Sequence, residues 1–318
     1  MSLDDDGIIV GGVPRSGTSL MRDILGSHPD VAMLPGELPV ARLAAGDFPA
    51  PDRHGRDPRE YLVGELVNHP RMAQAGIVLD ARAILDALGS EPPFTPVAVL
   101  AHVLRQLARQ AGRPRWGVKD PLAEFHTDRL LAELPRATIV HMVRDPRDVV
   151  TSSRARWGAA AQHVVSATDA WRRSAALGRR QREDRTHGFV SVRYEDLVAD
   201  PPAILRKVCN VAGLAYRPEM LERSTRPSGW GGSSDAGSRS PRVIFPDAVS
   251  RHVGQLPAGD RRFIELRAGR EMERWGYPRR PATLTARDRR LVALRLVQEA
   301  AWRALRRWVR LPKGWLGR

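Results

Sequence analysis

Cysteine and long apolar segments are scarce in this sequence of 318 residues, and each scarcity excludes a class of protein. The single cysteine, Cys209, cannot form an internal disulfide, and it rules out a zinc site built from several cysteines. No stretch approaches the roughly 18 consecutive apolar residues of a membrane-spanning helix. The sequence starts with Met-Ser-Leu-Asp-Asp-Asp, which lacks the basic start and apolar centre of a secretory signal. We therefore expect a cytoplasmic protein.

Positive charge is abundant: the sequence contains 51 Lys and Arg residues but only 36 Asp and Glu residues, which gives a formal net charge of +15. Such an excess is compatible with a nucleic-acid-binding protein, a membrane-surface protein or an enzyme that binds an anionic ligand. Lysine itself is scarce and occurs only at Lys119, Lys207 and Lys313. In a sequence that otherwise uses arginine, Lys119 is a candidate for a position that specifically requires a lysine.

Most of the excess charge lies near the C-terminus. Residues 279–318 contain twelve Arg or Lys residues and two acidic residues, a net charge of +10, which leaves +5 for residues 1–278. We therefore divide the chain into a single domain over 1–278 and a basic tail over 279–318. Apolar residues of the tail recur at helical spacing, at Leu291, Leu294, Val297, Ala301, Leu305 and Trp308. We expect a terminal helix that packs on the domain, with peripheral membrane contact through 285–311 as the alternative.

A glycine-rich turn near the start of the chain has the spacing of a phosphate-binding loop. Between an apolar strand and a helix, the sequence reads Gly12-Val13-Pro14-Arg15-Ser16-Gly17-Thr18-Ser19. Backbone N–H groups of such a loop, and the N-terminus of the helix after it, point at one anion. Thr18 stands where nucleoside triphosphatases carry a lysine, which argues against an ATPase or kinase, and Arg15 supplies a cation within the loop.

Short apolar strands alternate with longer helical segments over most of the chain. Strands are expected at 7–10, 30–34, 116–119, 137–143 and 188–194. Helices are expected at 18–25, 80–88, 96–111, 122–134, 147–156, 166–185, 201–212 and 258–275. This alternation predicts an α/β fold of the P-loop type, a doubly wound and mainly parallel sheet with helices on both faces. Residues 36–70 are expected to be irregular, and 224–256 to form a functional loop.

A second candidate anion site follows the apolar strand that ends at Val143. Arg144 lies at the carboxyl end of this strand, where open α/β sheets bind ligands, and Ser152 follows eight residues later on a helix. A guanidinium group and an adjacent hydroxyl suit a phosphate group. With the glycine-rich loop about 130 residues earlier, this element predicts a nucleotide that carries two separate anionic groups.

These two elements resemble those of the sulfotransferases that use 3′-phosphoadenylyl sulfate (PAPS). In that family a Pro-(Lys/Arg)-Ser-Gly-Thr loop binds the 5′-phosphosulfate, and a strand-end arginine with a following serine binds the 3′-phosphate. The sequence looks especially similar to the tyrosylprotein sulfotransferase branch. The blocks that carry this similarity are 11–22, His28-Pro29-Asp30-Val31, Lys119-Asp120-Pro121, Met142-Val143-Arg144-Asp145, Tyr194-Glu195-Asp196-Leu197-Val198 and Gly276-Tyr277-Pro278.

The resemblance implies roles for individual residues. Arg15 and Lys119 match the cations that stabilise the negative charge growing on the leaving phosphate. Arg144 and Ser152 match the clamp for the 3′-phosphate. The other residues that the resemblance assigns to nucleotide binding are Ser16, Gly17, Thr18, Ser19, Arg156, Tyr194, Ser240 and Arg251.

The reaction also needs a base for the acceptor hydroxyl. In the tyrosylprotein branch this base is a glutamate shortly after the His-Pro block, which implies Glu37 in this sequence. Many other sulfotransferases use a histidine. The histidines that stay open as alternative bases are His28, His54, His69 and His126.

The resemblance thus implies an enzyme that transfers the sulfuryl group of PAPS in line to an acceptor hydroxyl, without a metal ion. Its acceptor would be a small molecule, a lipid, a sugar or a tyrosine. The alternatives are an ATP-dependent phosphotransferase with a phosphate loop, and a basic protein that binds nucleic acid or a membrane surface. We expect no nucleic-acid partner, because the sequence has no recognisable binding motif and only 6% aromatic residues.

Overall fold

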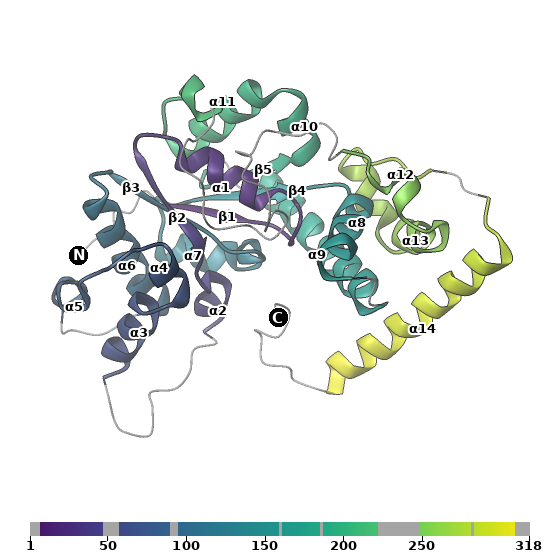
Figure 1. Cartoon of the computed structure of the whole chain (residues 1–318), viewed down its shortest axis with the longest axis horizontal. Coiled ribbons are helices and arrows are strands. Elements are labelled where there is room, and N and C mark those ends of the chain that lie inside the picture. Colours follow the sequence, from purple (N-terminus) through teal and green to yellow (C-terminus); the bar gives the residue numbers. More distant parts are fainter. Residues whose placement is uncertain are drawn as a thin grey trace.

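The fold is built on a parallel sheet. The computed structural model describes residues 7–46, 57–89, 95–158, 161–184, 187–221, 249–280 and 283–308. In this part of the chain, five strands form one parallel sheet in the order β2-β3-β1-β4-β5 (Figure 1). The strands are β1 (Ile8–Gly11), β2 (Val31–Glu37), β3 (Arg115–Lys119), β4 (Thr138–Val143) and β5 (Phe189–Arg193). This arrangement confirms the predicted α/β class.

Helices cover both faces of the sheet, as the alternation of elements predicted. Ile8 and Val10 of β1 pack into the core on one face, and Ile9 between them packs into the core on the other. The first face is covered by α1 (Thr18–Gly26), α10 (Tyr194–Ala199) and α11 (Pro201–Ala212). The second is covered by α2 (Val40–Ala45), α3 (Pro58–Val67), α5 (Ala81–Leu88), α6 (Pro96–Gln110) and α7 (Thr127–Glu133). Burial on both faces explains why the strands carry apolar residues at consecutive positions, as in Ile8, Ile9 and Val10 of β1.

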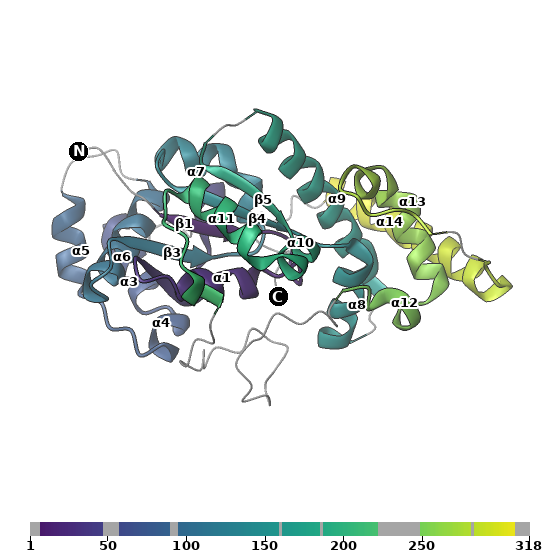
Figure 2. The ribbon, with the colours of Figure 1, turned by 90° about the horizontal axis from the view of Figure 1, so that it is seen from above.

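A third apolar core lies at one end of the molecule, around Trp171 and Phe263. It is formed by α8 (Pro146–Trp157), α9 (Ala161–Asp184) and α13 (Ala258–Arg274). The last helix, α14 (Ala286–Trp308), lies along α13 at this end (Figures 1 and 2). The remaining short elements are α4 (Pro70–Gln74), η1 (Ala123–His126), η2 (Pro218–Leu221) and α12 (His252–Gln255). None of the helices in the described ranges is both long and apolar enough to cross a membrane.

The expectation of an irregular segment over 36–70 is wrong for the residues that the structure describes there. Both α2 and α3 lie in this segment. Pro58 lies in the first turn of α3, after the N-cap residue Asp57, where proline is favoured. The Asp57 carboxylate accepts a hydrogen bond from the Arg59 N–H, as an N-cap side chain does. Of the loop expected over 224–256, only 249–256 falls within the described residues, and it contains α12.

Candidate active site

The carboxyl ends of β1 and β4 lie side by side in the middle of the sheet. From β1 the chain continues to one edge of the sheet, at β2, whereas from β4 it continues to the other edge, at β5. Doubly wound sheets bind ligands at such a point, because the two connections leave a crevice between the strand ends. The glycine-rich loop follows β1 and Arg144 follows β4, so both predicted anion sites lie at these two neighbouring strand ends.

The loop after β1 depends on its glycines. Gly12 and Gly17 have φ of 132° and 99°, in the region that favours glycine. A Cβ atom at Gly17 would lie 2.5 Å from Cδ2 of Tyr194, and one at Gly12 would lie 2.5 Å from the carbonyl oxygen of Met142. Gly17 is also the N-cap residue of α1 and has no side chain with which to cap it. The first N–H groups of α1 therefore face the loop, which is the geometry of an anion site.

A buried carboxylate holds the start of the loop. Oε2 of Glu124 accepts a hydrogen bond from the Gly12 N–H at 2.8 Å, and its Oε1 accepts one from the Ser174 hydroxyl at 2.6 Å. Because Ser174 gives its proton to Glu124, Nε2–H of His141 must donate to Ser174 Oγ, at 2.9 Å. Burial raises the pKa of Glu124 and lowers that of His141 to about 3. The neutral imidazole thus completes a buried hydrogen-bonded chain that ends at the loop.

The two predicted phosphate-binding elements meet directly. Nε of Arg15 donates a hydrogen bond to Oγ of Ser152 at 2.9 Å, although the residues are 137 positions apart. Nη1 of Arg144 donates to the carbonyl oxygen of Arg15 at 3.1 Å. The Arg144 guanidinium also lies 4.5 Å from the centre of the Tyr194 ring, a cation–π distance. The structure therefore brings Arg15, Arg144, Ser152 and Tyr194 into one group, next to Gly17.

Glu195 and Tyr277, from two blocks of the family resemblance, hold the end of β4. Oε1 of Glu195 accepts a hydrogen bond from the Asp145 N–H at 2.9 Å, and Oε2 accepts one from the Tyr277 hydroxyl at 2.6 Å. The Asp145 side chain caps α8 and pairs with Arg147, which is itself buried. These contacts position the backbone around Arg144. They explain structurally why the Tyr-Glu-Asp-Leu and Gly-Tyr-Pro blocks accompany the strand-end arginine.

Lys119 and Glu37 form an ion pair at the carboxyl ends of β3 and β2. The two residues are register partners, placed opposite each other by an irregularity in β2 after Met33. Nζ of Lys119 also lies 3.4 Å from Oγ of Ser19, on the first turn of α1. The Lys119 side chain is 4% exposed, whereas that of Glu37 is 42% exposed. Burial lowers the pKa of Lys119, and the Glu37 carboxylate opposes that shift.

Asp120 follows Lys119 directly, but Lys119 forms its ion pair with Glu37 and not with Asp120. Its Oδ2 instead accepts a hydrogen bond from the Ala41 N–H at 2.7 Å, in the first turn of α2. Desolvation among the surrounding protein atoms raises the pKa of Asp120 to about 8. In the Lys-Asp-Pro block, Lys119 therefore pairs with Glu37, while the carboxyl group of Asp120 binds the first turn of α2, the helix that follows Glu37.

The remaining predicted nucleotide contacts lie around this group. Arg156 is exposed on α8, one helical turn after Ser152. Arg251 immediately precedes α12, and its charge acts on the Tyr194 hydroxyl. The Asp148 carboxylate fixes this segment to α8, because it accepts hydrogen bonds from the backbone N–H groups of residues 250 and 252. Ser240, also predicted to contact the nucleotide, lies outside the described residues.

The described histidines that were alternative bases have other contacts. His28 is buried, and its Nε2 lies 2.8 Å from the Ala215 carbonyl oxygen. His69 caps α4, where its Nδ1 accepts a hydrogen bond from the Arg71 N–H. His126 lies at the end of η1, and His54 is outside the described residues. Glu37 is the candidate whose side chain contacts the predicted catalytic cation.

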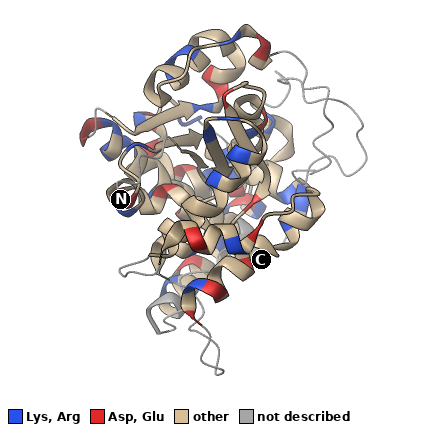
Figure 3. Cartoon of the chain, turned by 90° about the vertical axis from the view of Figure 1, so that its left-hand side faces the viewer, with Lys and Arg blue, Asp and Glu red and all other residues tan. Residues whose placement is uncertain are grey.

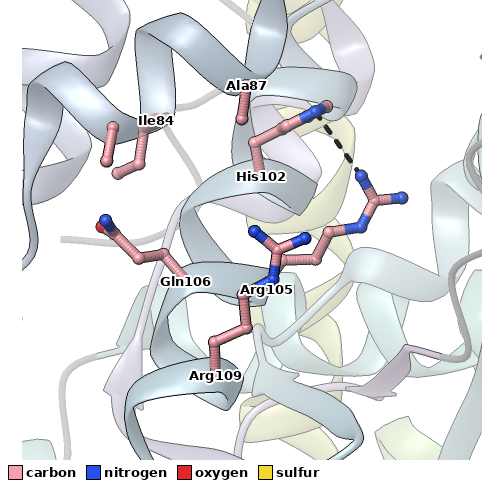
Figure 4. A pocket seen from close by; sticks show the side chains of 7 residues that line it. Ile84, Ala87, His102, Arg105, Gln106 and Arg109 are labelled. Atoms are coloured by element: carbon pink, nitrogen blue, oxygen red, sulfur yellow. Dashed lines mark hydrogen bonds between the residues drawn. The ribbon is translucent and has the colours of Figure 1, made fainter.

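A small pocket between α5 and α6 is separate from this site. Figure 4 shows Ile84 and Ala87 of α5 facing His102, Arg105 and Gln106 of α6. Nδ1 of His102 contacts the carbonyl oxygen of the preceding helical turn, and Arg105 lies 3.5 Å from its Nε2. The residues that line the pocket include none from the glycine-rich loop or the strand ends, so we assign it no part in the site.

Residues 7–218 match the sulfotransferase family model, and the chain belongs to this family of PAPS-using enzymes. The predicted family is thereby confirmed. Protein-tyrosine sulfotransferase 1 of Danio rerio is 27% identical over 281 residues, which cover 85% of this chain and 72% of that protein. Protein-tyrosine sulfotransferase of Drosophila melanogaster is 26% identical over 262 residues, which cover 79% of this chain and 47% of that protein.

The fold is similar to that of a solved sulfotransferase structure. The sulfotransferase domain from the Synechococcus PCC 7002 olefin synthase superposes with a TM-score of 0.55 at 21% sequence identity. The similarity covers 86% of this chain and 96% of that domain. This similarity supports the fold assignment.

Proposed function

We propose that this chain transfers the sulfuryl group of PAPS to an acceptor hydroxyl, with Glu37 as base and with Arg15 and Lys119 stabilising the leaving phosphate. The observation that carries the proposal is the contact between the two anion sites, from Nε of Arg15 to Oγ of Ser152. PAPS has two anionic groups, on the 5′ and 3′ sides of one nucleoside. A protein that binds it needs two such sites close together.

The residues at the ends of β1 and β4 suit these two groups. The loop N–H groups and the N-terminus of α1 suit the 5′-phosphosulfate, since Gly12 and Gly17 let the backbone approach an anion closely. Arg144 and Ser152 suit the 3′-phosphate, because a guanidinium and a hydroxyl both donate hydrogen bonds to phosphate oxygens. Tyr194 then holds the Arg144 guanidinium from one side.

The chemistry follows from the charges at the ends of β2 and β3. As the acceptor oxygen forms its bond to sulfur, the bond from sulfur to the phosphate oxygen breaks, and negative charge grows on that phosphate. Lys119 and Arg15 stabilise this charge more in the transition state than in the ground state. The proton of the acceptor hydroxyl passes to the Glu37 carboxylate, which Lys119 holds in place through their ion pair.

The acceptor reaches Glu37 from solvent. Its side chain is 42% exposed, while Lys119 on the neighbouring strand is buried. The relatives named protein-tyrosine sulfotransferases favour a phenolic hydroxyl as the first acceptor to test. Aliphatic alcohols, sugars and lipids complete the panel, because the sequence alone predicted a hydroxyl and not its class.

The proposal is tested by incubating the purified chain with PAPS labelled on sulfur and with each acceptor class in turn. We expect label in one acceptor class and stoichiometric release of 3′,5′-bisphosphoadenosine (PAP), with loss of both in Glu37→Gln. The matched control is Glu219→Gln, which alters a carboxylate of η2 outside the site. Transfer that persists in Glu37→Gln would remove the base assignment. Absence of transfer with every class, in protein that also binds no PAP, would overturn the proposed function.

A further inference from the structure

The last helix, α14, contacts the domain through its charged side. Nε of Arg295 lies 2.7 Å from Oδ1 of Asp260 on α13, and both side chains are buried. One turn later, Glu299 pairs with Arg267 of α13 and with Arg303 of its own helix. Figures 1 and 2 both show α14 running along α13 at the end of the molecule. The expected packing of a terminal helix on the domain is thus confirmed, but ion pairs make much of the contact.

Trp302 and Leu291 of α14 also face the domain, since Trp302 packs against the third core and Leu291 lies next to Gly259 of α13. Other apolar residues of α14 face the opposite way. Leu294 is 49% exposed and Val297 is 66% exposed, and Leu296 is exposed as well. The alanines at 293, 300, 301 and 304 are exposed too, at spacings that continue the same side of the helix. The expectation that this apolar row forms the packing surface is therefore wrong for Leu294, Val297 and Ala301. We call the row of exposed Leu, Val and Ala residues over 293–304 the outer face of α14.

Basic residues accompany the outer face. Arg290 precedes Leu294 by four residues and Val297 by seven, so it lies on the same side, and Arg289 beside it is also exposed. Residues 286–308 contain seven arginines and two acidic residues. Both acidic residues are engaged elsewhere, since Glu299 pairs with Arg267 and Asp288 accepts hydrogen bonds from Thr285 and from the Gly259 N–H. The exposed side of α14 is consequently apolar and cationic.

We propose that the outer face of α14 docks on the surface of an anionic lipid bilayer. Apolar side chains in one row, with arginines beside them, are the pattern of helices that lie in a membrane interface. The arginines would contact lipid phosphates, and Leu294 and Val297 would enter the acyl boundary. A second copy of this chain is a poorer occupant, because pairing two such helices would bring their arginines together. From the opposite side of the molecule, near α5, Figure 3 shows Lys and Arg interspersed with Asp and Glu along the described helices.

Vesicle co-sedimentation of the full chain tests this inference. We expect pelleting with vesicles that contain about a third phosphatidylglycerol, and little with pure phosphatidylcholine. The double variant Leu294→Gln, Val297→Gln should reduce the bound fraction at least about tenfold, because it removes apolar area without changing charge. Val78→Gln is the matched control, since Val78 is an exposed apolar residue between α4 and α5, at 83% exposure. Arg289→Gln, Arg290→Gln should weaken binding to anionic vesicles only.

Each outcome decides the inference. The Gln variants alter exposed side chains, so circular dichroism should report unchanged folding, and Val297→Ser serves as a milder second variant. Equal pelleting of the double variant and the wild type would overturn the role of the outer face, as would absence of pelleting of the wild type. A dimer by light scattering that the double variant dissociates, without vesicle binding, would assign the face to a second copy and overturn the proposal.

Discussion

Substitution of Lys119 by methionine separates catalysis from nucleotide binding in this site. Methionine keeps the length of the apolar stem, so it fills the buried position, but it removes the ammonium group that contacts Glu37 and Ser19. Glu37 is left without this partner, yet its side chain is 42% exposed and water can hydrate it. We therefore expect Lys119→Met to fold with a melting temperature close to that of the wild type.

The size of the catalytic effect follows from the charge that is lost. A unit charge about 4 Å from the developing negative charge is worth about 4 kcal/mol at an effective dielectric constant of about 20. Removing one preorganised donor from comparable sites lowers kcat by about 10² to 10³. We expect a loss in this range for Lys119→Met. The affinity for PAP should change less than about tenfold, because Arg144 and Ser152 are untouched.

Single-turnover transfer of the labelled sulfuryl group from PAPS to the best acceptor measures the rate, and calorimetry with PAP measures the affinity. Lys207→Met is the matched control, because Lys207 is an exposed lysine on α11, away from the strand ends. If Lys119→Met keeps more than about a third of the wild-type rate, Lys119 does not stabilise the transition state and the charge argument fails. A loss of PAP affinity equal to the loss of rate would instead make it a binding residue.

Three further substitutions probe the supports of the site. Burial raises the pKa of Asp120 from 3.8 to about 8, so between these pH values the native state keeps a proton that the unfolded state has released. The free energy of unfolding therefore falls as the pH rises from about 4 to about 8, by up to about 1.4 kcal/mol per pH unit. Asp120→Asn should flatten this dependence in urea titrations from pH 5 to pH 8, and an unchanged slope would contradict the shift. Glu124→Gln leaves one side-chain oxygen to accept hydrogen bonds from both the Gly12 N–H and the Ser174 hydroxyl. We therefore expect the free energy of unfolding to fall by about 1.5–3 kcal/mol and calorimetry to show weaker PAP binding. Unchanged PAP affinity would show that the loop does not need this carboxylate. Gly17→Ala should lower PAP affinity at least about tenfold, since its Cβ would lie 2.5 Å from the Tyr194 ring, and wild-type affinity would contradict the close approach.

The sequence could predict those parts of the site that depend on local spacing. The glycine-rich loop between a strand and a helix, and Arg144 at a strand end, are both local patterns, and the sheet places them next to each other. The ion pair between Lys119 and Glu37 required more than spacing. The two residues are opposite each other only because β2 changes register after Met33, which no local pattern shows.

Other features depend on contacts between distant segments. Glu124 supports the loop from 112 residues away, and nothing in its own surroundings in the sequence indicates that partner. The apolar row of α14 was interpreted as a packing surface, whereas Leu294, Val297 and Ala301 of that row are exposed. The helix contacts the domain through Leu291 and Trp302 and through the ion pairs of Arg295 and Glu299 with α13. Residues 36–70 were expected to be irregular, but they contain α2 and α3, and Pro58 lies in the first turn of α3, where proline is favoured.

The measurement that tests the account most directly is calorimetric binding of PAP and of adenosine 5′-phosphate to the wild type and to Arg144→Ala. The account predicts micromolar binding of PAP and weaker binding of the nucleotide without the 3′-phosphate. It also predicts that Arg144→Ala lowers the affinity for PAP about 10- to 100-fold, because the lost charge-assisted hydrogen bond to the 3′-phosphate contributes about 1.5–3 kcal/mol. The affinity for adenosine 5′-phosphate, which has no 3′-phosphate, should change little. Equal affinity of the wild type for the two nucleotides, or no binding of PAP, would contradict the assignment of two anion sites to one PAPS molecule.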